Sequence, residues 1–196
     1  LIPKNLPSKD CYELASIYKP HLGVGGDYFD FIEFQDGKIV FCVGDISGKG
    51  VAAALLMANF QANFHTLINK RTELDEFIRD LNTSVHLITQ GERFITFFIA
   101  EYDINTRQLN YVNAGHNFPL IYRNGEFLEL RTGGIILGMM DGMEYSSETI
   151  QLKKGDVFIL YTDGINEAMN DDGEEFEMDR FYQVIKETTR KSAEEI

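Results

Sequence analysis

Short hydrophobic segments bounded by polar and turn residues open the chain. Residues 12–20, 27–34 and 38–45 are rich in Tyr, Phe, Ile and Val, the residue types that favour strands. Asp36 and Gly37 lie between the second and third segments and favour a hairpin turn. The pattern therefore predicts three strands, the last two joined by a tight turn.

Two helical patterns follow. Residues 51–69 are apolar nearly all round in the first three turns, which predicts a helix buried against a sheet. Residues 74–90 instead carry one apolar stripe, with Thr72 and Asp75 at the spacing of a capping box, so the opposite face should be solvated. The stripe comprises Leu74, Phe77, Ile78, Leu81, Val85 and Ile88.

The pattern returns to strands after Gly91. Residues 93–103, 108–115, 118–125 and 126–130 form short apolar segments punctuated by Asn and Gly, and residues 157–163 form an apolar run that ends in an acid. A last helix is predicted over about 179–190. Strands, two long helices, more strands and a final helix predict an α+β domain of mainly antiparallel sheets covered by helices.

Composition narrows the class of protein. The 196 residues suit a single domain, 1–196, and the net charge of −13 disfavours nucleic acid as a partner. Cys11 and Cys42 show no CxxC spacing, which disfavours a disulfide framework or a zinc site and suits a reducing cytoplasm. The apolar run at 51–58 is shorter than the roughly 20 residues of a membrane helix, so no membrane contact by this domain is expected.

Three segments place an acid beside glycine at the edge of a predicted strand. They are VGGDYFD at 24–30, VGDISGKG at 43–50 and LYTDGINEA at 160–168, and their acids are Asp27, Asp45 and Asp163. Each acid alone is about as well explained by a turn. If the three met in space without a cation, repulsion and desolvation would be costly, so a bound metal is expected. Oxygen ligands without Cys or His favour Mg²⁺ or Mn²⁺.

Five blocks of the sequence resemble one known family. They are GGDYFD at 25–30, GDISGKGVAAALLMA at 44–58, YVNAGHNFPLIYRNG at 111–125, TGGIILGM at 132–139 and GDVFILYTDGINEAMNDDGEEF at 155–176. In this order and near this spacing, the sequence resembles the SpoIIE-type bacterial serine phosphatases, a branch of the PPM metal-dependent protein phosphatases. The resemblance covers nearly the whole sequence.

The resemblance implies an α-β-β-α sandwich with two Mn²⁺ or Mg²⁺ ions at one edge. It implies that Asp27, Asp45 and Asp163 are metal ligands and catalytic residues, and that the backbone carbonyl of Ile46 is a further ligand. The ions would acidify a water molecule that attacks phosphorus in line. The implied substrate is a phosphorylated serine or threonine of a regulatory protein, an anti-sigma-factor antagonist in a partner-switching pathway.

Other polar residues in these blocks rank lower. A lone His in a turn is more often structural, so His116 is left out of the catalytic set. Lys49 is interpreted as a solvated turn residue, and its segment lacks the upstream Gly of an NTPase phosphate-binding loop. Asp30 lies three residues after Asp27 and would face the opposite side of a regular strand.

The family pattern usually closes with a strand that carries an Asp-Asp pair, and this sequence ends at Ile196 without it. Either the chain is an excised piece of a larger protein or the protein lacks that ligand, and in both cases weaker metal occupancy is expected. The missing ligand also keeps open a catalytically silent relative that only binds partners. A diguanylate cyclase interpretation of GGDYFDF fits poorly, because the surrounding blocks match the phosphatases.

The resemblance also implies how such a domain is regulated. An upstream sensor or dimerising segment, lying before Leu1, would set the position of the helices at 51–69 and 74–90 against the metal edge. A homodimer and tethering through that upstream region are compatible with this expectation.

Overall fold

The computed structural model describes residues 3, 12–20, 25–48, 50–70 and 72–196. The described strands are β1 (Asp27–Glu33), β2 (Lys38–Ile46), β3 (Ile95–Asp103), β4 (Gln108–Ala114), β5 (Leu120–Arg123), β6 (Glu126–Glu129), β7 (Gly133–Gly134), β8 (Glu148–Gln151) and β9 (Val157–Ile159). The helices are α1 (Val51–Ile68), α2 (Leu74–Thr89), α3 (Asp163–Asn166) and α4 (Glu177–Thr188), followed by a short 3₁₀ helix at Ala193–Glu195.

The larger sheet is built around four antiparallel strands in the order β1-β2-β3-β4. Beyond β4, β7 pairs with it in parallel and β8 pairs with it antiparallel. The predicted turn around Asp36 and Gly37 joins β1 to β2, and Gly37 has a φ of 84°, which glycine adopts readily. The strands predicted after Gly91 are confirmed in order and type.

The smaller sheet, β6-β5-β9, is also antiparallel and packs against one face of the larger sheet. Successive side chains of a strand point to opposite faces of a sheet, so every second residue can enter the core between the two sheets. Phe98 and Ala100 of β3 lie in that core with Ile121 of β5. The Phe98 and Tyr111 rings stack in this core with centroids 5.7 Å apart.

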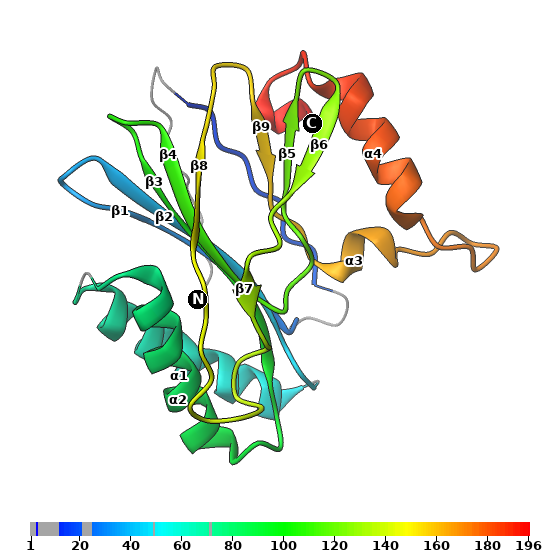
Figure 1. Cartoon of the computed structure of the whole chain (residues 1–196). Helices are drawn as coiled ribbons and strands as arrows, with labels where there is room; N and C mark the ends of the chain where they lie inside the picture. The colour runs from blue at the N-terminus through cyan, green and yellow to red at the C-terminus, as the bar shows by residue number, and fades with distance from the viewer. Residues whose placement is uncertain (1–2, 4–11, 21–24, 49, 71) are drawn as a thin grey trace.

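Helices cover the outer faces of both sheets (Figure 1). The α1 and α2 helices pack on the larger sheet, where Phe60 and Phe64 meet Phe97 of β3. The α4 helix packs on the smaller sheet, with Ile185 beside Leu120 of β5. The layers therefore run α-β-β-α, and the predicted architecture is confirmed.

The first predicted strand is wrong. Residues 12–20 form no strand apart from an isolated bridge position at Tyr12. Most of this segment is partly or fully exposed, and Ile17 is 88% exposed. Strand-forming residue types alone do not make a strand where no neighbouring strand offers hydrogen bonds.

The burial of α1 is also different from the prediction. One face of the helix lies in the core, but Val51 and Leu55 are 78% and 61% exposed. The sheet contacts one side of the helix only, so an apolar composition all round does not bury it all round. By length and composition alone α1 could cross a membrane, which is weak evidence because its buried face packs in the protein core.

The α2 helix follows its predicted stripe closely. It begins at Leu74 with Glu73 as N-cap and no capping bond from a side chain, so the capping box expected from Thr72 is not formed. Asp75 instead lies in the first turn, where a negative charge interacts favourably with the helix dipole. Ile88, at the far end of the stripe, is 46% exposed, whereas its neighbour Thr89 is buried.

Candidate functional site

The first two acids lie side by side on the larger sheet. Asp27 begins β1 and is directly opposite Asp45 of β2. Side chains at such cross-strand positions lie on the same face with Cβ atoms about 4.5–5.5 Å apart. Phe29, two residues after Asp27, packs in the core between the sheets. Both carboxylates therefore lie on the face turned toward the smaller sheet.

The third acid reaches the same place from the smaller sheet. The polypeptide leaves β9 at Ile159 and turns into α3 at Asp163, preceded by Thr162 as N-cap. Burial, followed by the negative charges of Asp45 and Asp163, raises the pKa of Asp27 to about 6, and a hydrogen bond from the Thr162 side chain opposes the shift. The pKa of Asp45 is raised by burial and then by the charge of Asp163. The structure thus brings the three acids within electrostatic reach of one another.

Gly26 keeps open a space between two oxygens of this group. A Cβ on Gly26 would lie 2.8 Å from Oδ1 of Asp45 and 2.9 Å from the carbonyl oxygen of Ile46. Contacts this short are essentially never made by real Cβ atoms. Ile46 is also held here because its N–H donates to the Gly26 carbonyl at 3.1 Å. A side chain at position 26 would fill the point at which the carboxylate and the carbonyl converge.

These residues fit a divalent cation as an open ligand set. No Lys or Arg among the described residues forms an ion pair with any of the three acids, so no described basic side chain compensates their charge. Carboxylate and carbonyl oxygens suit Mg²⁺ or Mn²⁺. Within the described ranges, however, no three His, Cys, Asp or Glu side chains lie close enough to hold one ion. The carbonyl of Ile46 and solvent or additional ligands would have to complete the coordination.

His116 links β3, the strand beside Asp45, to the segment just before Asp163. Its ring is 3% exposed and lies between Thr96, the β3 residue opposite Asp45, and the carbonyl of Tyr161. The Nε2 atom is 3.0 Å from that carbonyl and must donate, so Nδ1 accepts from the Thr96 hydroxyl at 2.8 Å. Burial lowers the pKa of His116 to about 4. The neutral ring holds Tyr161, two residues before Asp163, at a fixed distance from β3.

The other polar residues considered in the sequence analysis lie away from the three acids or outside the described residues. Asp30 points to the helix side of β1, away from the three acids, and binds Tyr28 and His65. Lys49 lies outside the described residues. Sequence reasoning missed Thr162, which donates to Asp27, and Thr96, which orients His116. Thr162 could have been found from its place directly before the candidate acid, whereas Thr96 carries no signal in its own segment.

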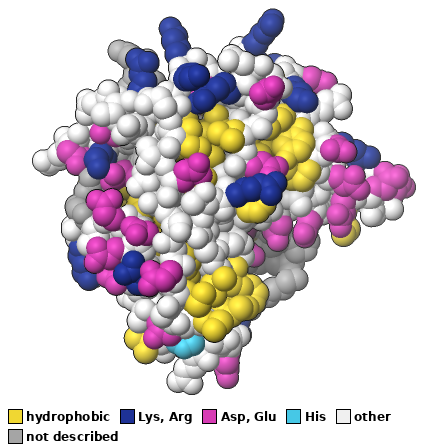
Figure 2. Space-filling model, in the orientation of Figure 1, with side chains coloured by type: hydrophobic (Ala, Val, Ile, Leu, Met, Phe, Trp, Pro, Cys, Tyr) yellow, Lys and Arg dark blue, Asp and Glu magenta, His cyan; other side chains and the backbone are white. Residues whose placement is uncertain are grey.

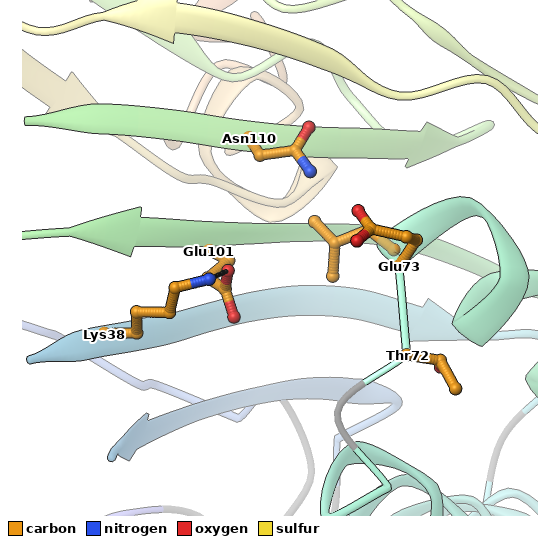
Figure 3. Close-up of a pocket in the computed structure, with 6 residues that line it drawn as sticks. Lys38, Thr72, Glu73, Glu101 and Asn110 are labelled. Atoms are coloured by element: carbon orange, nitrogen blue, oxygen red, sulfur yellow. Dashed lines mark hydrogen bonds and ion pairs between the residues drawn. The ribbon is translucent and has the colours of Figure 1, made fainter. Parts of the chain in front are cut away.

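A large cavity adjoins the acids and a small one does not. The large cavity, of about 530 Å³, is lined by His116, Tyr161 and Asn166 together with side chains of β6 and α4. The small one, of about 70 Å³, lies between the larger sheet and the start of α2 (Figure 3). Lys38 and Glu101 pair there at 2.6 Å, and the space suits water rather than a substrate.

Acidic side chains gather on one protruding part of the visible surface. Figure 2 shows them gathered on the protruding loop between α3 and α4. That loop contains Asp171, Asp172, Glu174 and Glu175, all exposed. A negative surface of this kind repels a phosphorylated ligand unless cations offset it.

Known proteins are similar to this chain in both sequence and fold. The family described as Stage II sporulation protein E (SpoIIE) matches residues 35–196. The chain is 27% identical over 198 residues to the phosphoserine phosphatase RsbU of Bacillus subtilis; the match covers 100% of this chain and 58% of that relative. The chain therefore spans less than two thirds of the length of that protein.

Two solved structures extend the comparison. The SiaA-PP2C domain of Pseudomonas aeruginosa superposes with a TM-score of 0.77 at 24% identity, over 90% of this chain and 72% of that one. RsbX in complex with magnesium superposes with a TM-score of 0.63 at 22% identity, over 92% of this chain and 88% of that one. At this identity the two structures establish the fold, which is of the PP2C type. The match over residues 35–196 shows more: this chain belongs to the SpoIIE family.

Proposed function

We propose that this protein is a divalent-metal-dependent protein phosphatase that removes phosphate from serine or threonine of a regulatory protein. The observation that carries this proposal is the uncompensated trio of acids around the space that Gly26 leaves open. The name of the relative RsbU, a phosphoserine phosphatase, supports the reaction class.

Each residue would have a distinct task. Asp45, Asp163 and the carbonyl of Ile46 would hold Mn²⁺ or Mg²⁺, and Asp27 would bind the ions directly or orient their water ligands. When bound, such ions supply a water molecule of lowered pKa and neutralise charge on phosphoryl oxygens. His116, with its pKa of about 4, stays neutral near neutral pH and serves as a positioning residue.

The finer statements rest on family membership. An anti-sigma-factor antagonist is the proposed substrate, and an upstream sensor or dimerising segment is the proposed regulator, with a homodimer as one assembly compatible with it. A cytoplasmic location suits such a substrate. The acidic surface in Figure 2 fits a protein partner better than a nucleic acid.

The test is release of inorganic phosphate from a phosphoserine protein in Mn²⁺ or Mg²⁺, and its loss in EDTA. Asp45→Asn is the control, because it removes a ligand charge with almost no change in the volume of the residue. A protein that releases phosphate equally well in EDTA would contradict the metal-dependent mechanism.

One observation favours a second candidate. Since no three ligating side chains of the described residues gather around one point, a catalytically silent relative that only binds a phosphorylated partner is compatible with the geometry. Such a protein would bind a phosphoserine protein and release no phosphate with either metal.

A further inference from the structure

The cavity of about 530 Å³ is lined mostly by side chains that have no task in the proposed hydrolysis. It lies where the β4–β5 loop, β6, α3 and α4 meet, and its lining includes Tyr161 and Asn166, which bracket Asp163 in sequence. His116, which lines the cavity, also lies within electrostatic reach of Asp163, so a ligand here would lie near that acid. The cavity is an open surface depression rather than an enclosed pocket, so it could accept a segment of polypeptide.

The charges on the cavity wall cancel one another. Glu129 accepts hydrogen bonds from Nε of Arg131 at 2.8 Å and from Oη of Tyr182 at 2.9 Å. A guanidinium paired in this way leaves no net positive charge. An anion alone, such as free phosphate, would find little attraction here.

Two hydrogen-bonding groups of the wall are not used by the fold. Asn166 lines the cavity, and its Oδ1 atom is shielded from water and has no hydrogen-bond partner. Within the described residues, Nη1 of Arg131 donates no hydrogen bond, and its side chain is 67% exposed. One acceptor and one donor match the N–H and C=O groups of a peptide backbone.

The wall is also partly apolar. The guanidinium of Arg131 lies over the ring of Phe118, 4.7 Å from its centroid, and that ring is 39% exposed. Met178 of α4 and the ring of Tyr161 add further apolar surface. A side chain next to the reacting residue of a substrate could bury apolar area against them.

We infer that this cavity binds the polypeptide segment flanking the phosphoserine of a protein substrate. The segment would lie extended, with a backbone N–H on Asn166, a backbone carbonyl on Arg131 and an apolar side chain against Phe118. The inference rests on the proposed function for the phosphoserine, but the cavity's recognition of a peptide can be measured without turnover.

The test compares two substrates in Mn²⁺: a synthetic phosphoserine peptide of about ten residues with a Leu next to the phosphoserine, and p-nitrophenyl phosphate. Phe118→Ala and Arg131→Ala should raise KM for the peptide about tenfold and change kcat/KM for p-nitrophenyl phosphate less than about twofold. Leu128→Ala is the matched control, because Leu128 is a similarly exposed apolar residue of β6 outside the cavity. It should change neither substrate.

Two outcomes would overturn the inference. Equal losses of kcat/KM with both substrates would mean that these residues act on the phosphoryl group. No loss with either substrate would mean that the cavity does not bind the peptide. If the unaltered protein hydrolyses neither substrate, the proposed function fails separately. Fluorescence anisotropy of the labelled peptide on the Asp45→Asn protein, with and without Phe118→Ala, then decides: equal affinity for both proteins would also remove the peptide site.

Discussion

Two aspartates of β1, three residues apart, have opposite surroundings. Asp30 faces α1 and is 8% exposed, and its carboxylate accepts hydrogen bonds from Oη of Tyr28 at 2.7 Å, Nε2 of His65 at 2.8 Å and the N–H of Phe31 at 2.7 Å. Asp27 faces the smaller sheet, where Thr162 donates to it and two further acids repel it.

The difference separates an acid satisfied by the fold from the acid proposed as a metal ligand. A buried carboxylate surrounded by donors is stabilised by the fold and leaves no room for a ligand. A carboxylate with a raised pKa beside other acids lacks a positive partner, which is how sites that bind cations or substrates differ from the rest of a protein. The comparison makes four predictions, given from the largest expected effect to the smallest.

Removing a charge from the trio should have the largest effect. Asp45→Asn should lower metal-dependent phosphate release by at least about 100-fold, because loss of a ligand charge weakens the cation that neutralises phosphoryl oxygens. Turnover of p-nitrophenyl phosphate in Mn²⁺ measures this. The circular dichroism spectrum should be unchanged, and activity at the level of the unaltered protein would show that Asp45 is not a ligand.

Removing the structural acid should instead affect folding. Asp30→Ala leaves the Tyr28 hydroxyl and the Phe31 N–H without their acceptor and should lower the free energy of unfolding by about 2–4 kcal/mol. Urea denaturation measures the change. Asp30→Asn, which keeps an acceptor oxygen, should cost less; equal losses in the two variants would mean that these hydrogen bonds do not stabilise the fold.

The repulsion at Asp27 predicts a pH dependence. Because the folded-state pKa of about 6 is higher than the value in an unfolded protein, about 3.9, the folded protein holds this proton more tightly. Stability of the metal-free protein should therefore fall as pH rises from about 4 to about 6.

Asp27→Asn should reduce that fall and stabilise the metal-free protein at pH 7 by about 1 kcal/mol, a value discounted for solvent screening. A protein of this size would then melt about 2–4 °C higher. Thermal melts in EDTA across this pH range measure both effects. A melting temperature for Asp27→Asn that is lower at pH 7 would show that the site does not strain the fold.

The smallest effect is expected at the helix end of the structural cluster. His65 donates to Asp30, but its side chain is 45% exposed, so water can replace the bond. His65→Ala should cost about 0.5–1 kcal/mol. Thr66→Ala, at the next position of the helix, is the control for helix propensity. A loss above that for Asp30→Ala would mean that His65, rather than Tyr28, holds the carboxylate.

The local hydrophobic pattern predicted most helices and strands of the fold. It failed where packing against other elements determines whether a residue is buried or paired. The stripe of α2 predicted its buried face because an amphipathic helix specifies which side faces the sheet. The apolar composition of α1 did not indicate which side of the helix faces the sheet, so the exposure of Leu55 was not predicted. Residues 12–20 had the composition of a strand, but in the part of the chain that the structure describes only Tyr12 takes a bridge position.

Some residues of the candidate site could likewise be predicted from the sequence, and others could not. The spacing of glycines and acids pointed to Asp27, Asp45 and Asp163, because each lies at a strand edge visible in its own segment. The contribution of Thr96 and the cavity formed with Arg131 could not be seen, since their partners lie in other strands and helices. Side chains distant in sequence meet only when the sheets pack.

The sequence by itself determined the order of most elements, the face of α2 and the three acids, because periodicity and turn chemistry act over a few residues. Tertiary structure alone decided that Asp27 is strained while Asp30 is satisfied. The physical reason is that burial and electrostatic repulsion depend on which groups surround a carboxylate in space, and packing of two sheets sets those neighbours.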